Sequence, residues 1–288
     1  MQVLEYFPFR IGQVINENLD EEEFSILEEI RIRCGRPIVL KLRNNDKVLD
    51  YKITTQDILR IVEKITENSM YSYQKQLCSG YITLKGGHRV GISGNVVMEE
   101  NKVININYIY SLNFRIARQI IGVSEKIINE IMCKDIINNT LIISPPGAGK
   151  TTILRDLIRN ISKTKTVGVV DERGEITAMY KNEPQNDMGL KVDILSNVSK
   201  SIGMKMLVRS MAPDLICADE IGTKEDVEAI KYAITSGVKG VFTAHGDSIE
   251  SIKKSPILKE LLELNIIDKI IILNKEDRNK IYVKNLKF

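Results

Sequence analysis

The chain has 288 residues, of which 43% are hydrophobic and 27% charged, with a formal net charge of +3. This composition is typical of a globular protein with one large or two ordinary domains. The net charge is too small to indicate a polybasic tail for nucleic acid or a membrane surface. No apolar run is long enough to span a membrane, and no secretory signal opens the sequence. We therefore expect a cytoplasmic protein with no integral membrane segment.

The first 122 residues predict a small α+β domain without a nucleotide motif. Helices are expected over residues 11–18 and over residues 56–66, the second one capped by Thr54 or Thr55. Strands are expected at residues 30–33, 38–42, 81–84, 89–94 and 103–110, where apolar residues alternate or Gly punctuates the pattern.

From residue 123 to the end, strands and helices alternate. Strands are expected at residues 141–144, 166–171, 215–219 and 240–244, with helices at residues 124–133, 152–161, 196–210 and 224–236. Such alternation predicts an α/β domain with a mainly parallel sheet covered on both faces. The segments 269–274 and 280–284, joined through Asp277, Arg278 and Asn279, predict a hairpin at the sheet edge.

A phosphate-binding loop is predicted between the first strand and first long helix of this second domain. The apolar run 141–143 ends in a Pro/Gly turn that closes with Gly149, Lys150 and Thr151, which is the P-loop order. We expect Lys150 at the loop apex, pairing with β- and γ-phosphates and not with protein, and the Thr151 hydroxyl on Mg²⁺. The expected nucleotide-binding residues are Ser144, Pro145, Pro146, Gly147, Ala148, Gly149, Lys150, Thr151 and Thr152.

One position departs from the P-loop pattern, because Ser144 stands where the motif has its first glycine. A Cβ at residue 144 would cost about 1–2 kcal/mol, but only if this residue needs a positive φ. The substitution leaves two alternatives open, an incidental turn between strand and helix, and a nucleotide-binding scaffold without turnover.

Two further strands end in acidic residues, as a site for nucleotide and metal requires. Asp219 and Glu220 end the apolar strand that begins at Leu215 in a Walker B arrangement, so we expect Asp219 in the Mg²⁺ shell and Glu220 as the general base. Glu172 follows the strand that ends at Asp171 and competes with Glu220 for the role of base. In each case the alternative is an acidic turn without catalytic function.

His245 closes the strand that is expected to follow the Walker B segment. A lone histidine is more often a structural residue, but at this strand end it would donate to a phosphate oxygen. We expect His245 to sense the γ-phosphate.

The order of these motifs resembles that of the type II/type IV secretion ATPases. Segment 209–222 resembles their Walker B region, segment 170–173 their acidic box, and segment 237–246 their histidine box. Within the superfamily the resemblance is nearest to a family of sporulation proteins, and it extends to segments 29–37, 87–94 and 113–118. The chain departs from the secretion ATPases at Asp219, where they usually have Gly, and at Ser144.

This resemblance implies a RecA-like P-loop domain that uses ATP and Mg²⁺. It further implies self-association into a ring, with six subunits expected, peripheral to the cytoplasmic face of a membrane. The implied partners are membrane-embedded components of a sporulation channel, and the implied role is a motor for assembly or transport. No nucleic-acid partner is expected, although a nucleic-acid-dependent RecA-like ATPase remains the alternative from another class.

Arg115 and Arg118 precede the expected domain boundary at Gly122. A domain folding over the nucleotide would place arginines there, so we expect one of the two to act as an arginine finger, with Arg89 as a third candidate. The alternative is a pair of surface arginines that contribute little.

Overall fold

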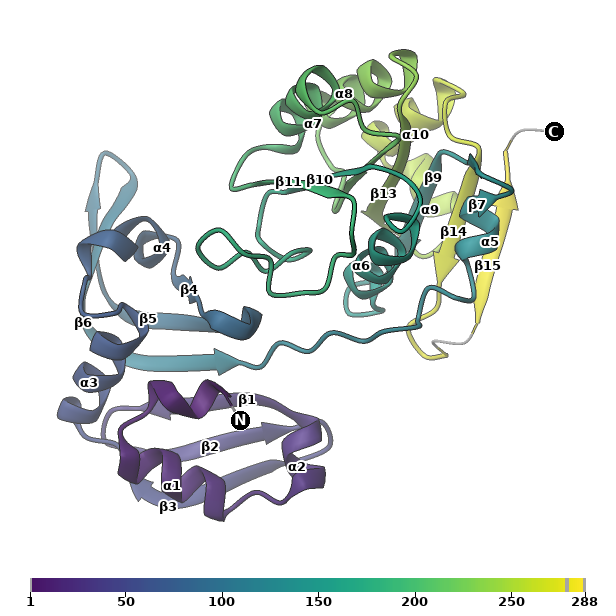
Figure 1. The fold of residues 1–288 in the computed structure, drawn as a ribbon. Helices are drawn as coiled ribbons and strands as arrows, with labels where there is room; N and C mark the ends of the chain where they lie inside the picture. Colours follow the sequence, from purple (N-terminus) through teal and green to yellow (C-terminus); the bar gives the residue numbers. More distant parts are fainter. Residues whose placement is uncertain (1, 278–279, 287–288) are drawn as a thin grey trace. The chain divides into compact units, whose positions relative to one another are not determined.

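The computed structural model describes residues 2–277 and 280–286 and divides into two compact units (Figure 1). The first unit comprises the chain up to Arg118 together with Ala178–Gln185, and the second comprises the remaining residues. The expected boundary at Gly122 lies inside the second unit, and the division into domains 1–122 and 123–288 remains a prediction.

The first unit is built on a six-stranded antiparallel sheet in the order β3-β2-β1-β6-β5-β4. Its strands are β1 (Leu27–Arg33), β2 (Pro37–Leu42), β3 (Asp46–Lys52), β4 (Tyr81–Thr83), β5 (Arg89–Glu99) and β6 (Lys102–Arg115). Strand β3 was not predicted, because its polar sequence exposes most of its residues and it depends on pairing with β2.

Helices of the first unit pack on one face of this sheet. They are η1 (Gln2–Tyr6), α1 (Phe9–Glu17), α2 (Glu21–Ile26), α3 (Thr55–Ile65), η2 (Tyr71–Tyr73), α4 (Gln74–Cys78) and η3 (Lys85–Gly87). Ile11 of α1 and Ile61 of α3 join Ile30 and Phe114 of the sheet in one buried core. Thr54 caps α3, since its hydroxyl accepts from the N–H of Asp57 while the Asp57 carboxylate accepts in return.

The other face of the same sheet carries basic residues. Glu29 of β1 lies in register with Lys41 of β2 and with Arg115 of β6, and Arg115 lies in register with Arg89 of β5. Residues in register share a face, so Arg89 and Arg115 are neighbours on the side opposite the core residue Phe114.

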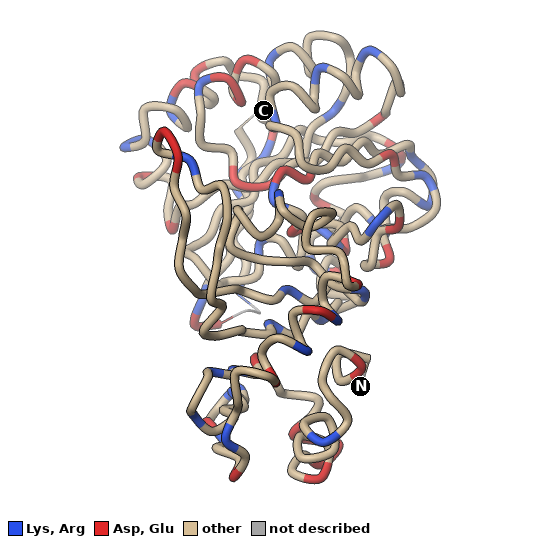
Figure 2. Tube along the Cα trace, turned by 90° about the vertical axis from the view of Figure 1, so that its left-hand side faces the viewer, with Lys and Arg blue, Asp and Glu red and all other residues tan. Residues whose placement is uncertain are grey.

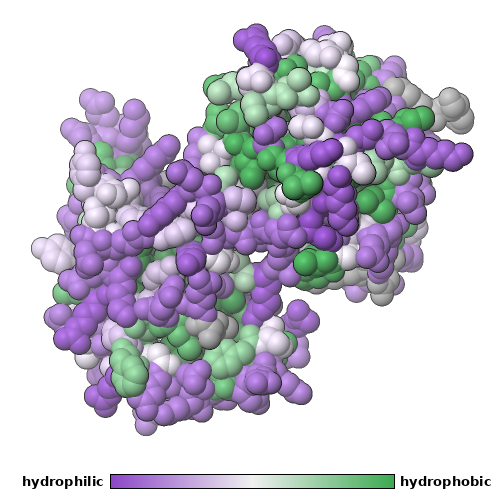
Figure 3. All heavy atoms as spheres, viewed as in Figure 1, coloured by the Kyte–Doolittle hydropathy of each residue, from purple (hydrophilic) through white to green (hydrophobic). Residues whose placement is uncertain are grey.

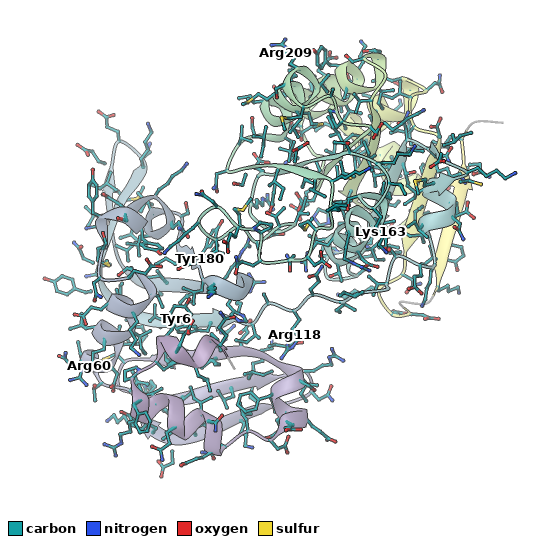
Figure 4. The ribbon with its side chains drawn as sticks, in the orientation of Figure 1. Tyr6, Arg60, Arg118, Lys163, Tyr180 and Arg209 are labelled. Atoms are coloured by element: carbon teal, nitrogen blue, oxygen red, sulfur yellow. The ribbon has the colours of Figure 1, made fainter. Side chains whose placement is uncertain are left out.

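Residues 178–185 belong to the first unit although they follow β10 in sequence. Tyr180, labelled in Figure 4, donates its hydroxyl hydrogen to Glu67, and the Lys181 ammonium lies 3.0 Å from the same carboxylate. The N–H of Gly86 donates to the Gln185 side chain at 2.7 Å. A segment from the middle of the P-loop half is thus anchored among residues of the N-terminal half.

The second unit is built on a seven-stranded sheet in the order β11-β10-β12-β13-β9-β14-β15. Its strands are β9 (Thr140–Ser144), β10 (Val167–Asp171), β11 (Val192–Ser196), β12 (Leu215–Ala218), β13 (Lys239–His245), β14 (Lys269–Leu273) and β15 (Ile281–Asn285). Neighbouring strands are parallel except for β15, which pairs antiparallel with β14 as the expected edge hairpin. Residues 278–279 of its expected turn lie outside the described residues.

Helices cover both faces of this sheet (Figure 1). They are α5 (Ile128–Ile131), α6 (Lys150–Ile161), α7 (Lys200–Ser210), α8 (Lys224–Thr235), α9 (Ile249–Lys254) and α10 (Pro256–Glu263), and β7 (Met132–Cys133) pairs with β8 (Ile136–Ile137) beside them. Successive residues of β9 point to opposite layers. Leu141 and Ile143 pack in the core that contains α7 and α8, and Ile142 packs in the core that contains α6. The expected α/β fold with a mainly parallel sheet is confirmed.

Two expected helices differ from the structure. The helix expected at residues 124–133 is reduced to α5, because the N–H and hydroxyl of Ser124 both donate to the buried Asp156 and hold the preceding turns against α6. The helix expected from residue 196 begins only at Lys200. Residues 192–196 form the unpredicted strand β11, whose partly exposed side chains give no clear periodicity and whose backbone pairs with β10.

Figure 2 shows Lys and Arg interspersed with Asp and Glu along both units, without a long run of one sign. The face drawn in Figure 3 is mainly hydrophilic, with separate hydrophobic patches. Within residues 2–277 and 280–286, every helix is too short or too polar to cross a lipid bilayer.

Candidate active site

The loop between β9 and α6 has the backbone that a phosphate cradle requires. Gly147 and Gly149 have φ values of 78° and 97°, which L side chains rarely adopt. A Cβ built on either glycine would meet no atom within 4 Å, so space for a ligand remains open above the backbone. Helix α6 begins at Lys150, and the N–H groups of its first turn have no intrahelical acceptor. The loop therefore presents amides and a helix N-terminus to an anion.

Ser144 does not strain this loop. It lies fully buried at the end of β9, and it is not among the non-glycine residues with a positive φ. Its hydroxyl donates to the carbonyl oxygen of Pro145 at 2.8 Å. The cost that a side chain would impose at a left-handed position therefore does not arise at residue 144.

Lys150 has protein partners, so the expectation that it pairs only with phosphate is wrong. Its Nζ donates to the Ser144 carbonyl oxygen at 3.2 Å and lies 3.1 Å from His245 Nδ1. Burial lowers the pKa of Lys150, while the carboxylates of Glu220 and Asp219 act in the opposite direction. Register explains the contact with His245, because β13 and β9 are adjacent and His245 lies opposite Ser144.

Asp219 is suited to hold a cation. It is 2% exposed, and its Oδ2 has no hydrogen-bond partner within the part of the chain that the structure describes. Burial raises the pKa of Asp219 to about 7, and the nearby carboxylates of Asp171, Glu175 and Glu220 add to the shift. A hard divalent cation such as Mg²⁺ would coordinate the unsatisfied oxygen and favour the ionised carboxylate. The residues present therefore fit a magnesium ion.

Glu220 is held by its backbone and by two side chains. Its φ is +48°, and its N–H donates to Thr243 Oγ1 at 3.0 Å. Arg173 Nη1 donates to Glu220 Oε2, and His245 Nε2 lies 3.4 Å from Glu220 Oε1. Lys150, His245, Glu220 and Arg173 thus form a continuous chain of polar contacts along the carboxyl ends of the strands.

The two acids that end β10 have different environments. Asp171 is fully buried, and its oxygens accept from the N–H groups of Glu175, Ile176 and Thr177 and from the Thr177 hydroxyl, so it fixes the next turn of the backbone. Glu172 forms an ion pair with Lys200 at the start of α7, and the Lys200 side chain is only 10% exposed. Glu172 is therefore already paired with a mostly buried ammonium group.

Arg115 and Arg118 lie in the first unit. Arg118 Nη2 donates to the carbonyl oxygen of Phe24 at 2.7 Å, whereas the exposed Arg115 ends β6. Their role as arginine fingers remains a prediction.

Two of the cavities lined by the described residues adjoin the loop, and they were not predicted from the sequence. One of about 560 Å³ borders Gly149 and Thr152, with aliphatic walls formed by Ile120, Ile121, Val123, Ile153, Leu273 and Ile281. Another of about 550 Å³ borders Pro145, and its lining includes Asp247, Glu250 and Glu276. The first cavity also borders Glu125 and Lys126, whose charges are opposite, whereas the second has three carboxylates and one lysine, Lys275. Carboxylates repel an anionic ligand, so the first cavity suits a phosphate-bearing molecule better. Its walls come from four separate segments, and no local sequence pattern marks them.

Arg173 and Lys200 were also not assigned a role from the sequence. Arg173 directly follows Asp171 and Glu172 in the sequence, and this proximity is a weak sign of a role in the site. Lys200 lies 28 residues beyond Glu172, so the sequence gives no sign that the two residues pair. Both contacts depend on which strands and helices are neighbours in space.

Solved structures with related folds include secretion and pilus ATPases. The ATPase DotB of Legionella pneumophila aligns with a TM-score of 0.58 at 15% identity, covering 96% of this chain and 79% of that one. DotB of Yersinia pseudotuberculosis gives a TM-score of 0.62 at 16% identity, over 98% and 80% of the two chains. The pilus retraction motor PilT with bound ADP gives a TM-score of 0.61 at 15% identity, covering 88% of this chain and 76% of that one. At this identity the similarity shows the fold alone, which is the RecA-like P-loop fold.

Sequence comparison is more specific. The chain is 38% identical over 281 residues to stage III sporulation protein AA of Bacillus subtilis (strain 168), covering 95% of this chain and 91% of that protein. The profile of the family described as sporulation stage III, protein AA matches residues 1–284. This chain is therefore a member of the sporulation stage III protein AA family, built on the fold of the secretion ATPases.

Proposed function

We propose that this protein hydrolyses ATP to ADP and phosphate with Mg²⁺. The observation that carries the proposal is the meeting of three features at one edge of the sheet. These features are the loop 147–152, the buried Asp219 carboxylate with its unsatisfied oxygen, and the polar contacts that join Lys150 to Glu220 through His245. An open α/β sheet binds its ligand at this edge, where the carboxyl ends of the strands lie.

The phosphates would occupy the loop, where the amides of residues 147–152 and the Lys150 ammonium compensate their charge. The nucleoside would extend into the aliphatic cavity beside Gly149 and Thr152, because that cavity borders the loop and its charged lining residues, Glu125 and Lys126, are of opposite sign. Ser144 supports the loop without strain, which favours binding over an incidental turn.

Thr151 and Asp219 would hold Mg²⁺. When bound, the ion would neutralise charge on the β- and γ-phosphates and orient them. Thr151 is the second residue of α6 and Asp219 directly follows β12, so both belong to the edge that carries the loop.

Hydrolysis requires a base for the attacking water, and Glu220 is the better placed of the two acids. It contacts His245, which in turn contacts Lys150, whereas Glu172 is committed to Lys200. When Lys150 pairs with the γ-phosphate, its ammonium group moves away from His245 Nδ1. The imidazole, once protonated from solvent on the vacated Nδ1, would then donate to a phosphate oxygen, and Glu220 Oε1 would accept the proton from water.

The wider role that we propose is that of a ring motor with six subunits, bound peripherally at the cytoplasmic face of a membrane complex. It would energise assembly of, or transport through, a channel during sporulation. Membership of the sporulation family supports the process, and the shared fold with DotB and PilT supports a motor. Sedimentation of the chain with and without a non-hydrolysable ATP analogue tests the ring. A chain that stays monomeric with saturating analogue contradicts it.

Steady-state phosphate release by the purified full chain with Mg²⁺ and ATP tests the central proposal. We expect turnover that disappears when EDTA removes the metal. Nucleotide binding without phosphate release above the buffer blank would instead indicate a scaffold without turnover.

A nucleic-acid-dependent ATPase is the second candidate, and one observation favours testing it. Arg89 and Arg115 lie side by side on the sheet face of the first unit that also carries Lys41. Such a face attracts phosphates, so the assay includes single-stranded DNA and RNA. We expect no stimulation. A rise in turnover that salt abolishes would favour the second candidate.

A further inference from the structure

Arg173 forms a contact that the proposed hydrolysis mechanism has not used. Its guanidinium donates to Oε2 of Glu220, the proposed base. The Arg173 side chain is 61% exposed and that of Glu220 is 26% exposed, so the pair lies at the mouth of the site. The other carboxylate oxygen, Oε1, is the one that lies 3.4 Å from His245 Nε2.

The backbone on both sides of this pair is fixed. The N–H of Glu220 is bound to Thr243 Oγ1, and the next N–H, that of Ile221, donates to the Thr243 carbonyl oxygen at 2.8 Å. With its backbone held on β13, Glu220 can change only the direction of its side chain. That direction is what a partner at Oε2 determines.

Arg173 projects from a short turn that is anchored at each end. Strand β10 ends at Asp171, and the Asp171 carboxylate binds the N–H groups of Glu175, Ile176 and Thr177 just beyond the turn. Only residues 172–174 lie between the two anchors, and β10 pairs directly with β12, which leads into Glu220. The position of Arg173 beside Glu220 is therefore built into the sheet.

A carboxylate that serves as base must turn one oxygen to the attacking water. With Arg173 on Oε2, the oxygen left for that water is Oε1, on the side of His245 and Lys150. We infer that Arg173 is a positioning residue that holds Oε2 of Glu220 and so presents Oε1 to the attacking water. This inference rests on the proposed ATP hydrolysis and on Glu220 as its base.

Two other roles for the same arginine predict different kinetics. An arginine that binds the phosphates of ATP would lower nucleotide affinity when removed. An arginine that blocks Glu220 until nucleotide arrives would raise kcat when removed. A positioning residue lowers kcat and leaves KM and nucleotide affinity unchanged.

The test measures kcat and KM for ATP with the full chain carrying Arg173→Ala, Arg173→Lys or Glu220→Gln, and the double variant Arg173→Ala/Glu220→Gln. We expect Arg173→Ala to lower kcat about 100-fold, the size of effect that a misplaced catalytic group produces. Lysine at residue 173 keeps a cation on Oε2 and should recover most of that loss. On the Glu220→Gln background, Arg173→Ala should change kcat less than about twofold, because the two residues act through one group.

Arg60→Ala is the matched control, since Arg60 is an exposed arginine on α3 that points away from the first unit in Figure 4. Affinity for a fluorescent ATP analogue reports on the fold of every variant. Unchanged or increased kcat in Arg173→Ala, a change confined to KM, or full additivity with Glu220→Gln would overturn the inference. An inactive parent chain would overturn the proposed function itself. An active parent that is insensitive to Glu220→Gln would overturn the assignment of the base, and with it this role for Arg173.

Discussion

Lys150 Nζ lies 3.1 Å from His245 Nδ1, although the two residues are 95 positions apart in the sequence. Adjacent strands bring them together, since His245 ends β13 in register with Ser144 at the end of β9. The lysine of the loop is thus held by the protein before any phosphate arrives. A γ-phosphate that attracts Lys150 therefore changes the surroundings of His245, and through it those of Glu220.

Lys150→Ala should abolish ATP turnover. Without the ammonium group, the charge of the β- and γ-phosphates is compensated by the loop amides alone. The fold should persist, because the variant loses only two polar contacts, one with the Ser144 carbonyl oxygen and one with His245 Nδ1. Phosphate release and analogue binding measure the first effect, and circular dichroism the second. A variant that hydrolyses ATP like the parent would show that the loop is not the phosphate site.

Glu220→Gln should bind ATP and Mg²⁺ like the parent, since Asp219 and Thr151 remain, but should hydrolyse it about 10²–10⁴ times more slowly. Glu172→Gln is the matched variant on the neighbouring strand. It removes an acid that is paired with Lys200, so we expect a loss of less than about tenfold in kcat. Single-turnover hydrolysis compares the two. The larger loss at residue 172 would reverse the assignment of the base.

Arg115→Ala should lower kcat more than Arg118→Ala. Arg118 already donates to the Phe24 carbonyl oxygen, whereas Arg115 is exposed at the end of β6. An arginine that compensates transition-state charge is worth about 10³–10⁵ in rate. Steady-state kcat with nucleotide affinity as control measures this effect. Recovery of turnover on mixing the inactive variant with Glu220→Gln protein would show that the arginine acts across subunits. Unchanged kcat in both variants would show that neither residue is an arginine finger.

Gly87→Ala should destabilise the first unit more than Gly35→Ala. Both glycines have a positive φ, 77° and 73°, so both substitutions carry the same backbone cost of about 1–2 kcal/mol. A Cβ on Gly87 would also lie 2.9 Å from the Ala178 Cβ, whereas one on Gly35 would meet no atom within 4 Å.

We expect the Gly87 variant to lose about 1–3 kcal/mol more in the free energy of unfolding, which is the usual cost of an overpacked contact. Urea unfolding followed by tyrosine fluorescence measures the difference. Faster tryptic cleavage after Lys181 would show that the loss arises where residues 178–185 are anchored. Equal stability of the two variants would show that this contact contributes nothing.

The sequence by itself determined the features that a few neighbouring residues encode. The Pro/Gly turn before Lys150 specified the loop, and the alternation of apolar strands with helical periodicity specified the parallel sheet. Residues that end such strands meet at one edge, so the pattern predicted Asp219, Glu220 and His245 at the same edge of the sheet as the loop, where they lie in the structure. The cap of α3 was narrowed to Thr54 or Thr55 for the same local reason, and the structure shows that it is Thr54.

Tertiary structure alone decided which of these groups touch. The strand order β10-β12-β13-β9 sets Arg173 beside Glu220 and His245 beside Lys150, and it follows from the packing of whole layers. Strand β11 shows little alternation of buried and exposed residues, and it forms because its backbone pairs with that of β10. Residues 178–185 likewise belong to the first unit through contacts with Glu67 and Gly86, far away in sequence. Local patterns encode periodicity and turns, whereas such pairings depend on distances that only the folded chain fixes.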